Sequence, residues 1–252
     1  MKKSWSSFLY EEIPEGGTLV VGIPDVGLVG PISTSHLVKA WELRSVGYFD
    51  SPDLPPVILF HDATPLMPMR LYGGYKGNDY VLVLHSDVAI PPQGIHSLAS
   101  FVVSFTQEKK LRRVFLLGGI AVQERLNIET PKTYAVSVDR DLLFYAQERG
   151  VEPLREGFIG GVYAQILKEG YKARVPVLAL LSECFLNYPD PGASASTLQA
   201  FSKITGHSID VKPLLEQEEE IRLRLREMMK RTMEAMRGVG KEYEYTIPAL
   251  YV

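Results

Sequence analysis

Short apolar runs alternate with helix-like stretches along most of the chain. The runs are rich in β-branched residues and leucine, are apolar at consecutive positions, and are bounded by turn residues, as buried strands are. They are TLVVGI (18–23), PPVILF (55–60), YVLVLHS (80–86), RVFLLGG (113–119) and VPVLALL (175–181). Helix-like patterns lie between them at 95–109, 140–149, 161–170 and 194–205. Strands without alternation, separated by helices, predict a mainly parallel sheet covered on both faces, which is an α/β three-layer sandwich.

The segment RLYGGYKGNDYVLVLHSD (70–87) departs from this alternation. Gly77, Asn78 and Asp79 mark a turn between two strand-like runs, which predicts an antiparallel hairpin joined to the core sheet. Prolines crowd the preceding stretch, 52–68, where they forbid a long helix and leave room for at most one short strand. We therefore expect a mixed sheet, in a core domain that spans residues 1–210.

Beyond residue 210 the pattern changes to that of one long amphipathic helix. Apolar residues recur at roughly helical spacing through residues 211–238, and most other positions there are charged. Glutamates gather at the start of this stretch and arginines lie toward its end, which is the order that a helix dipole favours. Gly238 and Gly240 would end the helix. The sequence thus predicts a helical arm at 211–238, followed by a flexible tail at 239–252.

Four methionines lie along the helical arm: Met228, Met229, Met233 and Met236. Methionine-rich helices are adaptable surfaces that pack against a domain or against a copy of themselves. A helix of this length cannot lie entirely on one compact domain, so we favour self-association into a homo-oligomer.

The composition is that of an ordinary globular protein, and it narrows the classes of partner. Of 252 residues, 46% are hydrophobic and 23% are charged, and the formal net charge is −3. A nucleic-acid-binding surface would show a basic excess, so nucleic acid is not an expected partner. The single cysteine, Cys184, and the lack of a signal-peptide core predict a reduced, cytoplasmic protein. No apolar run reaches the roughly 18 residues that span a bilayer, so no membrane partner is expected either.

The stretch VVGIPDVGLVG (20–30) places Gly22, Gly27 and Gly30 at a strand-to-helix turn, with a helix expected to begin near Ser33. Such a turn can present backbone N–H groups to a phosphate. The spacing, however, is neither G-x-G-x-x-G nor that of a P-loop. We therefore interpret the glycines as tight turns and close packing of helix on sheet, and we expect no cofactor.

The titratable side chains form no recognisable catalytic motif. The five histidines are scattered without an i, i+4 pair, so no metal site is expected. Asp62, Asp87 and Glu183 follow apparent strands, where α/β enzymes often keep their active sites, and 182–184 reads Ser-Glu-Cys. Without a G-x-S-x-G elbow, we interpret the carboxylates as helix caps and the cysteine as a small buried residue. The alternative is a nucleoside- or hydrolase-type enzyme with a pocket near Gly27, Asp62 and Asp87.

The last three residues, Leu250, Tyr251 and Val252, follow a polar and glycine-punctuated stretch. Their hydrophobic-Tyr-X pattern resembles the tail motif by which proteasomal ATPases and other activators dock between α-subunits of the proteasome core particle. The chemistry fits such a pocket. Leu250 would fill an apolar cleft, the ring of Tyr251 would be buried with its hydroxyl hydrogen-bonded, and the carboxylate of Val252 would pair with a lysine.

Three internal stretches agree with this reading. VVGIPDVGLVGPISTSHLV (20–38) is similar to the glycine-rich opening of the proteasome assembly chaperone family, whose archaeal members share G-x-P-x-x-G-x-V-G before a helix. FLLGGI (115–120) and LSECFLNYPDPGASASTLQAF (181–201) are similar to later landmarks of that family. The resemblance covers about residues 10–210.

The resemblance implies a non-enzymatic chaperone for proteasome assembly, with an α/β core similar to purine nucleoside phosphorylases but without their activity. Archaeal relatives form homo-oligomers from which C-terminal arms project. The implied partners are therefore core-particle α-subunits, reached through Leu250, Tyr251 and Val252, and further copies of the chain itself. Several weak tails on one oligomer would gain effective concentration at neighbouring pockets.

Overall fold

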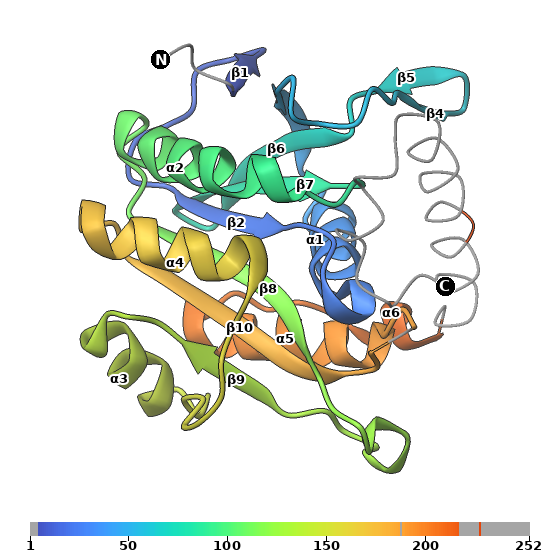
Figure 1. Ribbon diagram of the computed structural model, residues 1–252, viewed down its shortest axis with the longest axis vertical. Helices are drawn as coiled ribbons and strands as arrows, with labels where there is room; N and C mark the ends of the chain where they lie inside the picture. Colours follow the sequence, from blue (N-terminus) through green and yellow to red (C-terminus); the bar gives the residue numbers. More distant parts are fainter. Residues whose placement is uncertain (1–4, 187, 217–226, 228–252) are drawn as a thin grey trace.

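One mixed sheet of eight strands forms the centre of the protein (Figure 1). The computed structural model describes residues 5–186, 188–216 and 227. Across the sheet the strand order is β1-β3-β6-β7-β2-β8-β10-β9. The strands are β1 (Ser6–Leu9), β2 (Thr18–Gly22), β3 (Arg44–Asp50), β6 (Met69–Lys76), β7 (Asp79–Ser86), β8 (Arg113–Ala121), β9 (Thr133–Val136) and β10 (Val177–Cys184).

Parallel pairing is confined to the middle of this sheet. β2 pairs in parallel with β7 and β8, and β8 pairs in parallel with β10. The outer pairs, β1 with β3, β3 with β6, β6 with β7 and β9 with β10, are antiparallel. β6 and β7 form the predicted hairpin, with Lys76 opposite Asp79 and Gly77 in a left-handed conformation at φ 58°. The predicted mixed sheet is confirmed.

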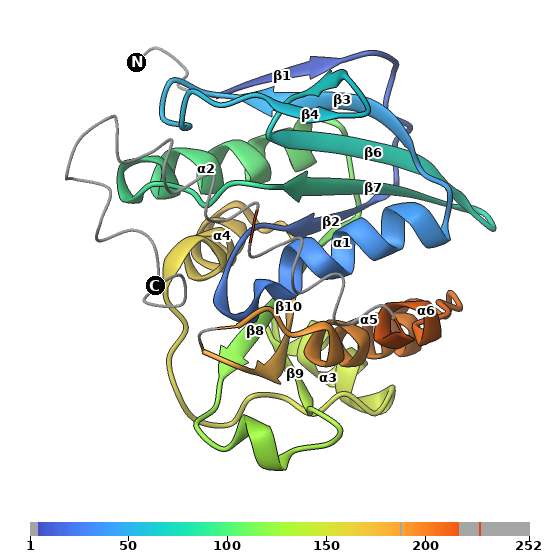
Figure 2. The same cartoon turned by 90° about the vertical axis from the view of Figure 1, so that its right-hand side faces the viewer.

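Helices cover both faces of the sheet and complete three layers (Figure 2). The helices α2 (Pro92–Glu108) and α4 (Gly161–Ala173) lie together on one face. On the other face lie α1 (Val29–Ala40), α3 (Arg140–Glu148) and α5 (Pro191–Thr205). β2 is buried at all five positions, as a strand between two helical layers must be. Leu19 and Val21 join the core under α2 and α4, whereas Val20 joins the core under α1 and α5.

The proline-rich stretch 52–68 differs from the prediction. It holds two short strands instead of at most one, β4 (Leu59–His61) and β5 (Thr64–Leu66), which form a separate two-stranded sheet. The run PPVILF is therefore not a buried core strand: Ile58 is 54% exposed and Phe60 is 68% exposed. The physical reason lies in the prolines, which cannot donate to a ladder and so keep this apolar run out of the main sheet.

The first helix begins earlier than the sequence suggested. α1 starts at Val29 instead of near Ser33. Gly27 and Leu28 take left-handed φ values of 67° and 51°. These two residues complete the turn that follows β2, so the helix begins at the next residue, Val29.

The short helix α6 (Lys212–Glu216) lies at the beginning of the stretch predicted to form the helical arm. Leu214 is buried there against Ala195 of α5, Ile32 of α1 and Leu28, which lies in the turn just before α1. The rest of the helical arm, apart from residue 227, and the whole tail lie outside the described residues. Among the residues that the structure describes, no helix combines the length and apolarity needed to cross a membrane.

Candidate functional site

The glycine-rich turn packs α1 tightly against the carboxyl end of the parallel strands. A Cβ atom at Gly22 would collide with the carbonyl oxygen of Gly30, and a Cβ atom at Gly30 would lie 2.7 Å from the carbonyl oxygen of Leu117 on β8. Only glycine, which has no Cβ atom, allows the backbone to approach this closely. Backbone atoms thus occupy the space beside Gly22 and Gly30, which supports the interpretation of these glycines as close packing of helix on sheet.

Asp25, in the middle of this turn, reaches across to β8. Its Oδ2 accepts a hydrogen bond from the backbone N–H of Gly119 at 2.9 Å. Its Oδ1 is enclosed, although the residue as a whole is partly exposed. Burial raises the pKa of the Asp25 carboxyl from 3.8 to about 8, and hydrogen bonds from backbone N–H groups offset only part of that rise. Burial likewise raises the pKa of Tyr163, whose hydroxyl donates to the carbonyl oxygen of Leu117 at 2.7 Å.

This raised pKa predicts a pH-dependent stability that Asp25→Asn removes. Between pH 4 and pH 8 the folded protein keeps a proton that the unfolded chain releases, so stability falls as pH rises, by up to about 1.4 kcal/mol per pH unit. Above pH 8 the contribution levels off. We expect the melting temperature of the wild type to fall more steeply from pH 5 to pH 8 than that of Asp25→Asn. Asp62→Asn, an exposed control, should follow the wild type; equal slopes for all three proteins would contradict the prediction.

A buried ion pair holds the loop between β10 and α5. The guanidinium of Arg125 donates to both carboxylate oxygens of Asp190, at 2.8 and 3.0 Å, and lies over the ring of Phe185. Asp190 also accepts from the backbone N–H groups of Phe185 at 3.1 Å and Ala193 at 2.9 Å, so it caps α5. Its own N–H donates to the carbonyl oxygen of Gly27 at 2.8 Å. The proline-containing loop is thereby tied to the glycine-rich turn.

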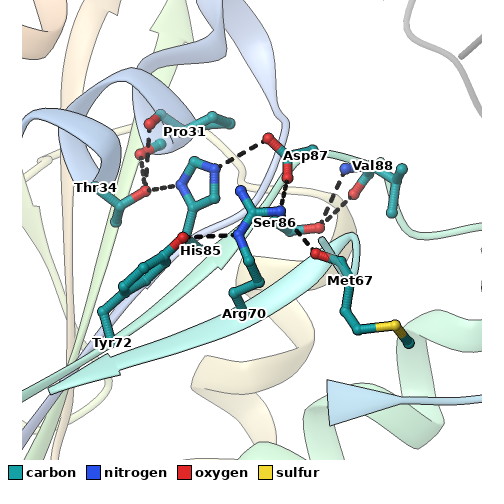
Figure 3. Close-up of polar contacts among 10 residues, drawn as sticks. Pro31, Thr34, Met67, Arg70, Tyr72, His85, Ser86, Asp87 and Val88 are labelled. Atoms are coloured by element: carbon teal, nitrogen blue, oxygen red, sulfur yellow. Dashed lines mark hydrogen bonds and ion pairs between the residues drawn. The ribbon is translucent and has the colours of Figure 1, made fainter. Parts of the chain in front are cut away.

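A second buried cluster joins β6, β7 and α1 (Figure 3). Asp87 pairs with Arg70 at 2.6 Å and with Nε2 of His85 at 3.2 Å. Nδ1 of His85 lies 2.9 Å from the hydroxyl of Thr34, which donates to the carbonyl oxygen of Gly30 at 3.0 Å. Burial opposes ionisation of Asp87, but His85 and Arg70 outweigh it and hold the pKa of that carboxyl below its usual value. Asp87 therefore stays ionised between two basic partners.

A sequence profile of the PAC2 family matches residues 19–229, which include the glycine-rich turn, both buried clusters and the start of the helical arm. The chain belongs to the PAC2 family. The resemblance to proteasome assembly chaperones drawn from the three sequence landmarks is confirmed.

Solved structures repeat the fold of this PAC2 protein. PbaA of Pyrococcus furiosus, described as an archaeal homologue of proteasome-assembly chaperone, matches with a TM-score of 0.81 and 28% identity, over 92% of this chain and 100% of PbaA. PbaB of the same organism, described as an archaeal proteasome activator, shares the fold with a TM-score of 0.77 and 24% identity, over 89% of this chain and 98% of PbaB. An uncharacterized protein of Methanocaldococcus jannaschii is 26% identical over 91% of this chain and 92% of its own length.

The three residues of the alternative enzyme pocket, Gly27, Asp62 and Asp87, lie in different surroundings in the structure. Gly27 packs against the side chain of Cys184, while Asp87 is enclosed in its network with Arg70. Asp62 lies in the β4–β5 turn with its side chain 91% exposed. The recess between β9 and α5 and the smaller one beside Asp79 and His207 are lined by none of these three residues. Cys184 is buried as predicted, and burial raises the pKa of its thiol, which disfavours the nucleophilic thiolate.

The interpretation of Asp62, Asp87 and Glu183 as helix caps is wrong. Among the described residues, Asp139 caps α3 and Asp190 caps α5 instead. Glu183 instead fastens β10 to the start of β9, because its carboxylate accepts from the backbone N–H of Lys132 at 3.0 Å and from the hydroxyl of Tyr134 at 2.9 Å. These contacts cross between neighbouring strands, so no local sequence signal marks them.

Two of the histidines connect elements of the fold in this PAC2 protein. His85 belongs to the buried cluster, and Nε2 of His36 lies 2.7 Å from the carbonyl oxygen of Asp210. Among the described residues, no group of three or more histidine, cysteine or acidic side chains could hold a metal ion.

The segment that leads into the helical arm is fastened to the core. Besides the contact from His36 on α1, Nε1 of Trp41 donates to the carbonyl oxygen of Ser208 at 3.3 Å. His207 pairs with Asp79 of β7 at 3.0 Å. Together with the burial of Leu214, these contacts hold residues 207–214 against the core. The predicted docking residues, Leu250, Tyr251 and Val252, lie outside the described residues.

Proposed function

We propose that this PAC2 protein is a non-enzymatic, cytoplasmic factor for proteasome assembly that binds the α-subunits of the core particle. The observation that carries the proposal is the match to PbaA, an archaeal homologue of proteasome-assembly chaperone, over all of that chain. The profile match shows the family independently of that structure. The burial of Cys184 and the enclosure of Asp87 support a core without catalytic chemistry, because neither side chain is placed to act on a substrate.

The proposed contact is the C-terminal tripeptide, Leu250, Tyr251 and Val252, which would dock between neighbouring α-subunits. The anchored root at residues 207–216 supports this arrangement, since it gives the 36 residues that follow a fixed starting point on the core. One tripeptide on a tether binds weakly after the cost of ordering it, so we propose that the chain acts as a homo-oligomer that presents several tails.

A pull-down tests this proposal. The full chain should retain recombinant core-particle α-subunits, and a variant that ends at Ala249 should lose them. Light scattering on both proteins supplies the control: each should give the same mass, above the 28.2 kDa of one chain. Retention of α-subunits by the shortened variant, or a monomer mass for the full chain, would contradict the docking or the oligomer respectively.

A further inference from the structure

A recess of about 580 Å³ opens between the edge strand β9 and the helix α5. It lies apart from the glycine-rich turn and from the root of the helical arm. Three segments supply its walls: the start of β9, the stretch after α3, and one face of α5. The lining residues that matter here are Lys132, Thr133, Glu152, Arg155, Gln199 and Lys203.

Positive charge collects in this recess although the chain as a whole is negative. Lys132, Arg155 and Lys203 line it against one carboxylate, Glu152, which lies 3.9 Å from Arg155. Within the described residues, the ammonium groups of Lys132 and Lys203 make no hydrogen bond or ion pair. The carboxylate of Glu183, which accepts from the backbone N–H of Lys132 and the hydroxyl of Tyr134, is a second acidic group beside the recess. Three cations against two carboxylates leave a positive excess that attracts an anion.

A chain of hydrogen-bonded hydroxyl groups ends at one wall of the recess, and the direction of each of its hydrogen bonds is fixed. Thr197 donates its hydroxyl proton to the carbonyl oxygen of Ala193 at 3.0 Å, so it can only accept from Ser182, 2.6 Å away. Ser182 therefore donates its hydroxyl proton to Thr197 and must accept a hydrogen bond from the hydroxyl of Thr133, also at 2.6 Å. Each hydroxyl has one proton, and the lone pairs of Thr133 therefore remain for a donor in the recess. A bound molecule with a hydroxyl group satisfies them.

We propose that this recess binds a small phosphorylated polyol, such as a sugar phosphate. The phosphate would lie among Lys132, Arg155 and Lys203, and a hydroxyl of the polyol would donate to Thr133. Lysine ammonium and arginine guanidinium groups both bind phosphate, the lysines as point charges and the arginine through its planar fork. The outer edge of β9 offers no pairing site for a peptide at Ala135, because that residue already bonds Glu152 and Leu154 at 2.8 and 3.0 Å. The observations thus favour a small molecule over an acidic strand.

Calorimetry with glucose 6-phosphate tests the charge in this proposal. Binding should weaken as salt is added, and Lys132→Gln/Lys203→Gln should weaken it by roughly tenfold or more. The matched control is Lys168→Gln/Lys172→Gln, which removes the same charge from exposed positions on α4, on the opposite face of the sheet. No binding by the wild type, or equal weakening by both pairs, would overturn the proposal. Citrate that binds as tightly as the sugar phosphate would overturn the assignment to phosphate.

Thr133→Val tests the polyol separately. The variant keeps the shape of the side chain and removes the acceptor, so glucose 6-phosphate should bind roughly fivefold more weakly, the worth of one neutral hydrogen bond. Pyrophosphate carries no alcohol hydroxyl, and its affinity should not change. Sugar-phosphate binding that is indifferent to Thr133→Val would overturn the polyol assignment. Melting curves of each variant show whether the fold is retained, and the α-subunit pull-down should be unaffected by all of them.

Discussion

Replacing Asp190 with alanine is expected to lower the free energy of unfolding by about 3–5 kcal/mol, because it leaves the guanidinium of Arg125 buried without its counter-charge. Arg125 is 8% exposed and Asp190 is 1% exposed, so solvent cannot take over the lost interaction. The variant also loses the cap of α5 and the acceptor for the N–H of Phe185. For a domain of this size we expect the melting temperature to fall on the order of 10 °C.

Two further variants isolate the cause of that loss. Asp79→Ala removes an aspartate that also pairs with an arginine and a histidine, but its side chain is 38% exposed, so the cost should stay below about 1 kcal/mol. Adding Arg125→Met to Asp190→Ala should recover part of the stability, since no unpaired charge then remains buried. If Asp190→Ala costs no more than Asp79→Ala in chemical denaturation, the ion pair does not hold the loop as we infer.

The central strands could be predicted from the sequence because burial on both faces leaves a continuous apolar run. β2, β8 and β10 all carry that signal, and each lies between two helical layers. The sequence pattern does not indicate β1, β3 or β9, and the reason is physical. β1 and β9 are four-residue edge strands with few buried positions, and β3 is broken by a bulge between Ser45 and Gly47. The run at 55–60 shows the converse, an apolar stretch that its prolines exclude from the sheet.

The buried clusters were harder to predict because their partners are far apart in the chain. Asp190 carries a local signal, since an aspartate before Pro191 and a run of small residues is a helix start. Nothing local indicates that Arg125, 65 residues away, would meet it. The contact of Asp25 with Gly119 crosses 94 residues and depends on β2 and β8 being neighbours. Sequence reasoning identified the glycine-rich turn and its role, but the pairing of charged residues needed the strand order.

Tyr251→Ala is expected to weaken the binding of each tail to core-particle α-subunits by roughly thirtyfold. A central aromatic residue at an interface is worth on the order of 2 kcal/mol, which corresponds to that factor. An oligomer that presents several tails would lose more, because each tail contributes to the avidity. Binding isotherms on immobilised α-subunits measure the effect. Tyr251→Phe keeps the buried ring and removes only the hydroxyl, so its loss should be several-fold smaller.

Two variants decide whether position matters as well as residue type. Tyr245→Ala removes the same side chain six residues earlier in the tail, where no docking contact is proposed, and should bind as the wild type does. A glycine appended after Val252 moves the terminal carboxylate out of reach of its lysine and should weaken binding as strongly as Tyr251→Ala, since a charge-assisted hydrogen bond is lost. Equal binding by Tyr251→Ala and the wild type, or equal loss in Tyr245→Ala, would show that the tripeptide is not the anchor.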